Sequence, residues 1–346
     1  MTLEEKFKQD KKKYVCGNPW LLAEVFEDSA YMCCPHWLPE PLPNPKEIKK
    51  EWNGDKATKI RESILDGSYS YCREDRCPKL ISLKEGKVHG FFKKEEFLKI
   101  YGDKKEQSPQ IVKFNFDRSC NLKCPSCRLD LINMKGKERE EADELAMSIE
   151  EQLGPELEEV QLTGTGDPFY SRTFRQWLLR FEPSNYPSLK RVHLHTNGTL
   201  WNKYNWDKMK KVHPYVSTCE ISVDAATKDT YENKVRLGGK WDDIVNNLNY
   251  ISTLPYLRDV TVSFVMQEKN FTELKSFYDF IEGIFKNSKK NWKVVFHRLN
   301  NYGHMTEEQF KDQDISNPLH RKYPEFIKLY KQLPKTINII HNLEVI

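Results

Sequence analysis

The stretch FDRSCNLKCPSCR (residues 116–128) places three cysteines in a C-x3-C-x2-C array, directly after the apolar run IVKFNF (residues 111–116). Thiolates suit soft metal ions, and a closed structural zinc site takes four protein ligands. No histidine or further cysteine lies between Gln110 and Arg128. The array is therefore either a zinc site that needs a distant fourth ligand, or an iron–sulfur site in which one iron stays open.

Short apolar runs and helical patterns alternate from this stretch to about residue 300. The strand-like runs are residues 111–116, 158–164, 189–196, 215–223, 259–266 and 292–297, and the helical patterns are 138–153, 171–181, 203–212, 241–254 and 271–285. Such alternation predicts an α/β fold with a parallel sheet of βα units. The units are too few for a closed eight-fold barrel and suit an open or partial one, with its chemistry where strands end and loops begin.

The composition excludes several classes of partner. Lys and Arg total 55 against 51 Asp and Glu, and a net charge of +4 is too balanced to indicate a nucleic-acid partner. No run approaches the roughly 18 to 20 apolar residues of a membrane span. The start, MTLEEKFKQDKKK, lacks the apolar centre of a signal peptide. We expect a soluble cytoplasmic protein with no membrane partner.

Five of the nine cysteines lie in the N-terminal quarter, namely Cys16, Cys33, Cys34, Cys72 and Cys77. In a reducing cytosol, clustered cysteines indicate metal ligation or redox chemistry rather than disulfides. This lobe, residues 1–82, shows one convincing helix at 47–65, so a metal would help to stabilise it. Four thiolates suit a closed iron–sulfur cluster or a zinc site. Cys219 lies in an apolar run, where we expect a buried free thiol.

The triplet and the segments after it resemble the radical S-adenosylmethionine (SAM) superfamily over residues 111–300. The matching segments are C-x3-C-x2-C, LTGTGDP (162–168), HTNGT (195–199), ISVDAATKDTYENKVRLGGKW (221–241) and SFVMQEKN (263–270). The resemblance implies a partial (β/α)6 TIM barrel. It also implies a [4Fe-4S] cluster held by Cys120, Cys124 and Cys127, with S-adenosyl-L-methionine on the open iron. Such enzymes cleave SAM reductively to a 5′-deoxyadenosyl radical that abstracts a substrate hydrogen.

The same resemblance assigns residues around SAM. It implies that the SAM amino group lies at the glycine-rich loop, and that Ser222 contacts the ribose and Arg236 the methionine carboxylate. The remaining implied cofactor-binding residues are Gly164, Thr165, Gly166 and Asp167 of that loop, Asn197 of the strand-three turn, and Val265 and Met266, whose backbone lies near adenine. Two positions depart from the family pattern: Ser126 replaces an aromatic residue, and Asp167 replaces a glutamate.

The N-terminal lobe resembles the SPASM/twitch auxiliary module of radical SAM enzymes, in its single-cluster twitch form and placed before the barrel. The resemblance implies a second [4Fe-4S] cluster held by Cys16, Cys72, Cys77 and one of Cys33 and Cys34, of which we favour Cys33. We therefore expect four regions: the module at 1–82, a linker at 83–110, the barrel at 111–300 and a C-terminal helical extension at 301–346.

A closed second cluster suggests net oxidation, with that cluster as the electron acceptor. The expected substrate is a peptide or protein, or a small molecule of the sugar or aminocyclitol type. The expected electron donor is a protein such as flavodoxin or ferredoxin. A proton acceptor is also required, and His195, Asp224 and His297 are the candidates by position. The competing hypothesis is a non-catalytic α/β binding protein stabilised by two zinc sites.

Overall fold

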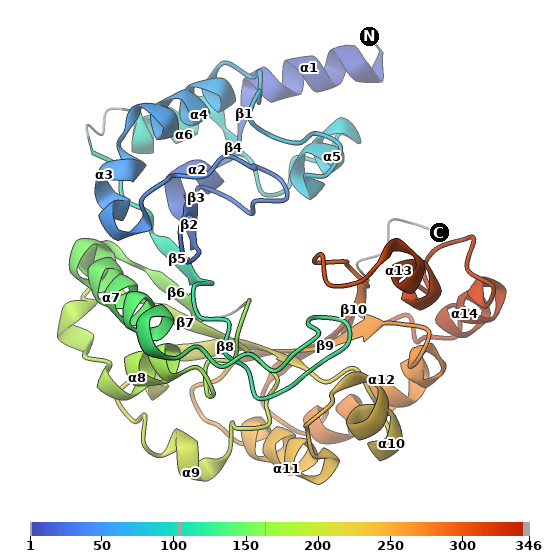
Figure 1. Cartoon of the computed structure of the whole chain (residues 1–346). Helices are drawn as coiled ribbons and strands as arrows, with labels where there is room; N and C mark the ends of the chain where they lie inside the picture. Colours follow the sequence, from blue (N-terminus) through green and yellow to red (C-terminus); the bar gives the residue numbers. More distant parts are fainter. Residues whose placement is uncertain (1, 103–105, 163, 342–346) are drawn as a thin grey trace. The chain divides into compact units, whose positions relative to one another are not determined.

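A computed structural model describes residues 2–102, 106–162 and 164–341. The chain divides into two compact units. Unit 1 comprises Met1–Asp117, Lys135–Gln161 and Glu182–Lys190, and unit 2 comprises Arg118–Met134, Leu162–Phe181 and Arg191–Ile346. Both units contain helices and strands (Figure 1). Each unit contains one of the two groups of cysteines.

Unit 1 contains far more regular structure than the sequence suggested. Its helices are α1 (Leu3–Lys13), α2 (Asn18–Leu21), α3 (Ile48–Trp52), α4 (Asp55–Leu65), α5 (Pro78–Lys84), α6 (Lys94–Tyr101) and α7 (Gly136–Leu153). The strand order is β6 (Glu159–Leu162), β5 (Ile111–Phe114), β2 (Leu22–Val25) and β3 (Ala30–Tyr31), with β2 parallel to β5 and antiparallel to β3. A separate antiparallel pair joins β1 (Tyr14–Val15) to β4 (Phe92–Lys93).

The single helix expected at residues 47–65 is two helices. Helix α3 ends at Trp52 and α4 begins at Asp55, so the break falls at Asn53-Gly54. Both residues favour turns over helix interiors, and the Asn53 side chain donates to the carbonyls of Lys49 and Gln107, at 2.8 and 2.9 Å. The spacing of apolar residues continues with a helical period across Asn53-Gly54, so the sequence pattern alone predicted one helix.

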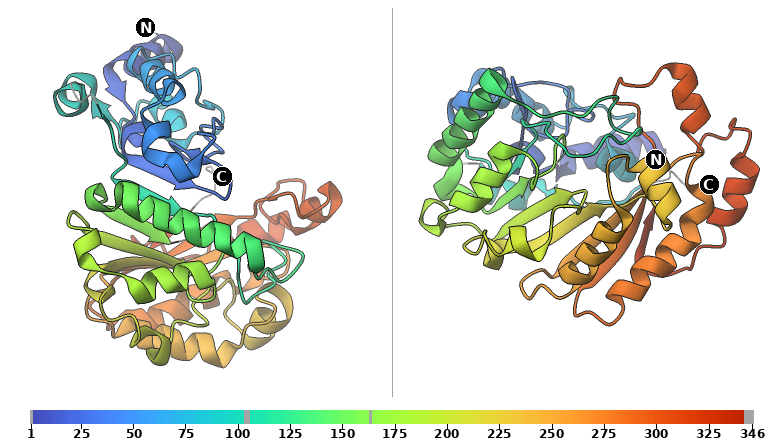
Figure 2. Two further views of the ribbon diagram at one scale, coloured as in Figure 1. Left: turned by 60° about the vertical axis from the view of Figure 1, so that its left-hand side comes forward. Right: turned by 60° about the horizontal axis from the view of Figure 1, so that its bottom comes forward.

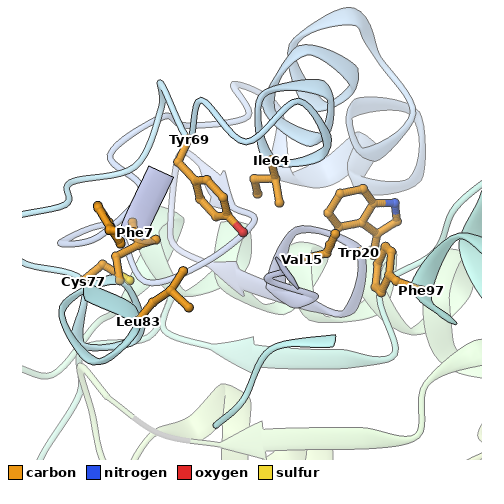
Figure 3. Packing of buried hydrophobic residues seen from close by; sticks show 9 residues of the cluster. Phe7, Val15, Trp20, Ile64, Tyr69, Cys77, Leu83 and Phe97 are labelled. Carbon is orange, nitrogen blue, oxygen red and sulfur yellow. The ribbon is translucent and has the colours of Figure 1, made fainter. Parts of the chain in front are cut away.

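The core of unit 1 is largely aromatic. Trp20 of α2 meets Phe97 of α6 edge to face, with ring centroids 4.8 Å apart. Phe7 of α1 and Leu83 of α5 belong to the same buried cluster, and Figure 3 shows Cys77 among these apolar side chains. The lobe therefore has a hydrophobic core of its own, which a bound metal would supplement.

Unit 2 is built on five parallel strands in the order β7 (Arg191–Thr196), β8 (Val216–Ser222), β9 (Asp259–Met266), β10 (Asn291–Arg298) and β11 (Ile339–His341). Its helices are α8 (Arg172–Arg180), α9 (Lys203–Trp206), α10 (Lys228–Thr230), α11 (Trp241–Ser252), α12 (Leu274–Phe285), α13 (Glu307–Gln313) and α14 (Tyr323–Tyr330). The expected strands in this unit are all present, and β11 is an addition from the C-terminal extension. Figure 2 shows these strands from two further directions.

The two faces of this sheet differ. Ile221 of β8 and Val262 and Phe264 of β9 are fully buried, whereas Glu220 and Ser222 alternate with them and are only partly buried. Parallel strands are usually apolar on both faces because both are covered. A polar, partly accessible face on parallel strands departs from this pattern, so it is a candidate site. No helix in the described residues combines the length and hydrophobicity that a bilayer crossing requires.

Candidate functional site

The three cysteines of the motif lie in the loop that follows β5. Cys120 and Cys124 are buried and Cys127 is exposed. Cys127 and Arg128 donate their backbone N–H groups to the carbonyl of Cys124, at 2.9 and 3.0 Å, which folds the loop into a single turn. Burial raises the pKa of the Cys120 thiol to about 12. Cys120 is therefore a neutral thiol at neutral pH, and a bound metal would supply the positive charge that stabilises its thiolate.

Each sulfur of the triplet receives a hydrogen bond from a side-chain nitrogen. Asn197 donates from Nδ2 to Cys120 Sγ, and Arg236 donates from Nη1 to Cys124 Sγ, each at 3.5 Å. Arg128 donates from Nη2 to Cys127 Sγ, also at 3.5 Å. Hydrogen bonds to sulfur are a means by which proteins orient and tune iron–sulfur ligands. The sequence motif did not reveal Arg128, although it directly follows the third cysteine.

Arg236 is held in place by Asp224. One carboxylate oxygen of Asp224 forms an ion pair with Arg236 Nη2 at 2.7 Å, and the other accepts a hydrogen bond from the backbone N–H of Val265 at 2.8 Å. Asp224 is fully buried and has φ 62°, an uncommon backbone conformation for a residue other than glycine. Arg236 Nε is buried and has no hydrogen-bond partner in the described part of the chain. The arrangement leaves a buried donor beside the cysteine loop.

Asp167, at the end of the glycine-rich loop, is fully engaged with its own chain. One carboxylate oxygen accepts from the Thr196 hydroxyl at 2.7 Å and the Asn197 N–H at 2.9 Å. The other accepts from the N–H groups of Phe169 and Tyr170, at 3.0 and 3.3 Å. This carboxylate therefore fastens the glycine-rich loop to the HTNGT turn.

The rest of the glycine-rich loop lies near the third cysteine. Gly164 has φ 92°, a conformation that favours glycine. The carbonyl of Thr165 accepts a 2.7 Å hydrogen bond from Arg128 Nη2, so the guanidinium that meets Cys127 Sγ also holds this loop. Gly166 follows in the same bend, and Thr163 lies outside the described residues.

The turn after β7 is close-packed. Gly198 has φ 74°, and a Cβ at this position would lie 2.7 Å from Ile244 and 2.8 Å from Ile221. Beside it, Asn197 Nδ2 donates to Asn121 Oδ1 at 2.9 Å, and Asn121 Nδ2 donates to Thr199 Oγ1 at 2.9 Å. Only glycine fits at this position. The turn it allows places Asn197 against the cysteine loop.

The predicted adenine and ribose positions already have partners in the chain. The Val265 carbonyl accepts from Asn270 Nδ2 at 2.9 Å, and the Val265 N–H is used by Asp224. The Ser222 hydroxyl lies 3.1 Å from His195 Nε2 and 3.1 Å from Ser263 Oγ. Met266 is buried at the end of β9. Contacts from these residues to a nucleoside would add to, or replace, these bonds.

Glu220 connects the two histidines that the sequence singled out. Its carboxylate lies 3.3 Å from His297 Nε2 and 3.8 Å from His195 Nε2. Burial opposes the charged form, but the two imidazoles outweigh it and hold the pKa of Glu220 well below its usual range. Sequence reasoning missed Glu220, although it lies two residues before Ser222 and therefore on the same strand face.

The second group of cysteines surrounds a small cavity in unit 1. Cys16, Cys33, Cys72 and Cys77 all line it, although they come from separate segments of the chain. Burial, together with the neighbouring sulfurs of Cys16 and Cys77, raises the pKa of Cys33 to about 12. The pKa of Cys72 is raised by burial and by the same neighbours. Four thiols in one cavity favour a cofactor that brings positive charge.

Cys34 does not line this cavity. Burial raises its pKa, and the charged groups that act on it most are Glu24 and Lys113, not the four cysteines. Cys219, as expected, is buried within β8, and burial raises its pKa.

Two polar side chains accompany the four cysteines. Asn18 donates from Nδ2 to Cys33 Sγ at 3.2 Å, and the Lys79 ammonium lies 3.8 Å from Cys16 Sγ. The Tyr69 hydroxyl accepts from the Cys16 N–H at 3.2 Å and donates to the Tyr14 carbonyl at 2.9 Å. Asn18 and Lys79 each lie two residues after a cysteine, and this spacing was the only signal available in the sequence.

In residues 2–102, 106–162 and 164–341, no group of three or more His, Cys, Asp or Glu side chains converges as a site for a single metal ion. Zinc requires its thiolates about 2.3 Å from one centre, whereas a four-iron cluster binds each thiolate at a different corner.

One family model matches the part of the chain that contains the cysteine loop. Residues 114–281 match the model of the Radical SAM superfamily. No curated protein sequence gives a significant match.

Three solved structures illustrate the structural similarity. TYW1 with a lysine-pyruvate adduct bound has 15% identity and a TM-score of 0.37 over 68% of this chain and 75% of that one. Native anSMEcpe with bound AdoMet and Cp18Cys peptide has 14% identity and a TM-score of 0.38, over 63% and 60%. BtrN in complex with AdoMet and 2-DOIA has 13% identity and a TM-score of 0.24, over 58% and 96%.

Proposed function

We propose that this chain is a radical SAM enzyme. The observation that carries the proposal is the cysteine loop, in which Cys120, Cys124 and Cys127 each receive a nitrogen donor within a region that matches the superfamily model. Three thiolates suit a four-iron cluster with one open iron. When bound, this cluster and SAM together supply a 5′-deoxyadenosyl radical, which abstracts a hydrogen atom from the substrate.

The chain's own residues would hold and orient SAM. The buried, unpartnered Nε of Arg236 supports its assignment to the methionine carboxylate, since a bidentate guanidinium contact suits that group. Asp224 would then orient Arg236, a role that its burial favours over that of proton acceptor. Asp167 would shape the loop, because its oxygens already accept four hydrogen bonds, and the SAM amino group would meet the loop backbone of Gly164, Thr165 and Gly166.

The contacts to the nucleoside follow from the same geometry. Ser222 is a candidate for the ribose, by exchanging its bond to His195 or Ser263. Because the polar backbone groups of Val265 are engaged, Met266 is the better candidate for adenine. Asn197 would support the cluster through Cys120.

We propose further that Cys16, Cys33, Cys72 and Cys77 hold a second [4Fe-4S] cluster, in a twitch-type module. The support is that four cysteines share one cavity and do not converge on a single ion. A closed cluster supplies one-electron redox chemistry. Cys34 is not among the proposed ligands because it lies outside the cavity.

A closed second cluster favours net oxidation of the substrate. The substrate would be a peptide or protein, or a small molecule of the sugar or aminocyclitol type, and a flavodoxin or ferredoxin would supply the reducing electron. His195 and His297, joined through Glu220, form the group best suited to accept the substrate proton, because the carboxylate would stabilise a protonated imidazole.

The competing hypothesis is a non-catalytic protein with two zinc sites. Anaerobically purified chain would decide between them through its metal content and colour. We expect about eight irons per chain, a brown colour, and 5′-deoxyadenosine after addition of SAM and dithionite. Colourless protein that contains zinc, or iron-replete protein that gives no 5′-deoxyadenosine, would contradict the proposed function.

A further inference from the structure

Lys79 is the only cation that lines the cavity of the four cysteines in the described residues. It lies in the first turn of α5, two residues after Cys77. Its ammonium is 3.8 Å from Cys16 Sγ, and it donates to Asn18 Oδ1 at 2.9 Å and to the carbonyl of Gly90 at 3.2 Å. The amide and the carbonyl fix the ammonium beside the sulfur.

Asn18 extends the same arrangement to a second sulfur. Its oxygen accepts from Lys79, so its amide nitrogen is directed away and donates to Cys33 Sγ at 3.2 Å. A Lys79–Asn18 relay therefore reaches two of the four sulfurs, one by charge and one by a hydrogen bond. The dipole of the amide is oriented by the ammonium, which makes the N–H a better donor.

The charge of Lys79 is not offset by a neighbouring acid. In the described parts of the chain no carboxylate pairs with it, and no Asp or Glu lines the cavity. Arg236 at the other cysteine site differs, because Asp224 lies 2.7 Å from it and is fully buried. Lys79 is half-buried, and both of its hydrogen-bond acceptors are neutral, so its positive charge beside the sulfur of Cys16 is not cancelled by a paired carboxylate.

We propose that Lys79, positioned by Asn18, raises the reduction potential of the second cluster and so makes that cluster an electron acceptor. This inference rests on the proposed function, in which the four cysteines hold a four-iron cluster. Reduction adds one negative charge to the cluster and its thiolates. A fixed ammonium and an N–H donor at two of those thiolates stabilise the reduced state more than the oxidised one.

The test is a redox titration followed by electron paramagnetic resonance. The full chain carries Cys120, Cys124 and Cys127 replaced by Ala, so that only the second cluster gives a signal, and the electron comes from dithionite through mediators. Lys79→Met removes the charge at similar length, and Lys79→Arg keeps it. Lys87→Met is the matched control, because Lys87 is exposed and pairs with Glu85 at 2.7 Å.

We expect Lys79→Met to lower the equilibrium constant for reduction at least about tenfold, which is about 59 mV for a one-electron couple. Asn18→Leu, which removes both the N–H donor and the anchor of Lys79, should shift the constant in the same direction. Lys79→Arg and Lys87→Met should stay within about threefold of the parent. Equal potentials for Lys79→Met and its parent, with four irons retained, would overturn the inference.

The result also separates this inference from the proposed function. If the parent chain with the triplet removed contains zinc or no metal, the second cluster itself is contradicted, whatever Lys79 does. If the parent contains the cluster but Lys79→Met loses iron, Lys79 is needed for cluster assembly. In that case the reduction potential of the cluster in Asn18→Leu, which should retain iron, decides the inference. An unchanged potential in that variant overturns it.

Discussion

The two cysteine sites are assembled in different ways. In unit 2, three cysteines share one loop, and donors from other segments are brought to them, such as Asn197 after β7 and Arg236 after β8. In unit 1, four cysteines come from separate segments and meet only because the lobe has folded. The first site can be recognised from local spacing, whereas the second depends on a hydrophobic core. Loss of a ligand should therefore have different consequences at the two sites.

The largest expected effect is at the loop site. Cys124→Ala removes the sulfur that meets Arg236, so formation of 5′-deoxyadenosine should fall to background while about four irons per chain remain. The measurements are iron content and chromatography of the SAM products. Cys219→Ala is the control, because Cys219 is a buried thiol in β8 that touches neither site. Retained SAM cleavage in Cys124→Ala would show that the loop does not hold the reactive cluster.

A pair of adjacent cysteines tests the site in unit 1. Cys33→Ala should remove about half of the iron, since Cys33 lines the cavity and receives the Asn18 hydrogen bond. Cys34→Ala should leave iron unchanged, since Cys34 does not line the cavity. Iron analysis and the EPR signal of the reduced protein measure both. The reverse result would make Cys34 the ligand, and equal losses would mean that neither assignment is right.

This difference also explains what the sequence could reveal. The strands of residues 111–298 and most of their helices follow from alternating hydrophobic periods, and the cysteine loop follows from one short motif. The helix expected at 203–212 was wrong in length, because α9 ends at Trp206 and turns follow it. The sequence could not show that Asp167 fastens the glycine-rich loop to the next turn. Two of the four groups that donate hydrogen bonds to its carboxylate belong to Thr196 and Asn197, at the end of the next strand. Motif position identifies a residue's neighbourhood, but not the hydrogen bonds that its side chain makes.

The lobe shows where sequence reasoning failed. Strand β2 is only four residues long, and its neighbour β5 lies more than 80 residues later in the chain, so no local pattern indicates their pairing. Asn18 and Lys79 become recognisable only when Cys33 and Cys16 are seen beside them. Long-range pairing and ligand surroundings are properties of the folded chain, and residue spacing does not encode them.

A smaller effect is expected at Arg236, the cation beside the cysteine loop, which differs from Lys79 in having a buried carboxylate partner. Asp224→Asn leaves Arg236 buried without a counter-charge, which should lower the free energy of unfolding by about 3 to 5 kcal/mol and weaken SAM binding. Denaturant titration and equilibrium dialysis with SAM measure the two effects. Asp229→Asn is the control, because Asp229 pairs with Lys234 at the surface and should cost less than about 1 kcal/mol. Equal stability of the two variants would contradict a structural role for Asp224.

The smallest expected effect concerns Glu220, whose charged network has no counterpart in the cavity of unit 1. Glu220→Gln keeps the shape but removes the charge that His195 and His297 stabilise, so the free energy of unfolding should fall by about 1.5 to 3 kcal/mol at neutral pH. The pKa of Glu220 is lowered by folding from an ordinary value of 4.5. Its contribution is therefore complete above about pH 4.5, and it is lost as the pH falls toward the folded-state pKa.

The measurement is denaturant unfolding of the parent and Glu220→Gln at several pH values. The difference between them should be larger at pH 5 than at lower pH, because protonated glutamic acid and glutamine are both neutral. A difference between parent and Glu220→Gln that grows as the pH falls would mean that the Glu220 carboxylate is not stabilised by its histidines.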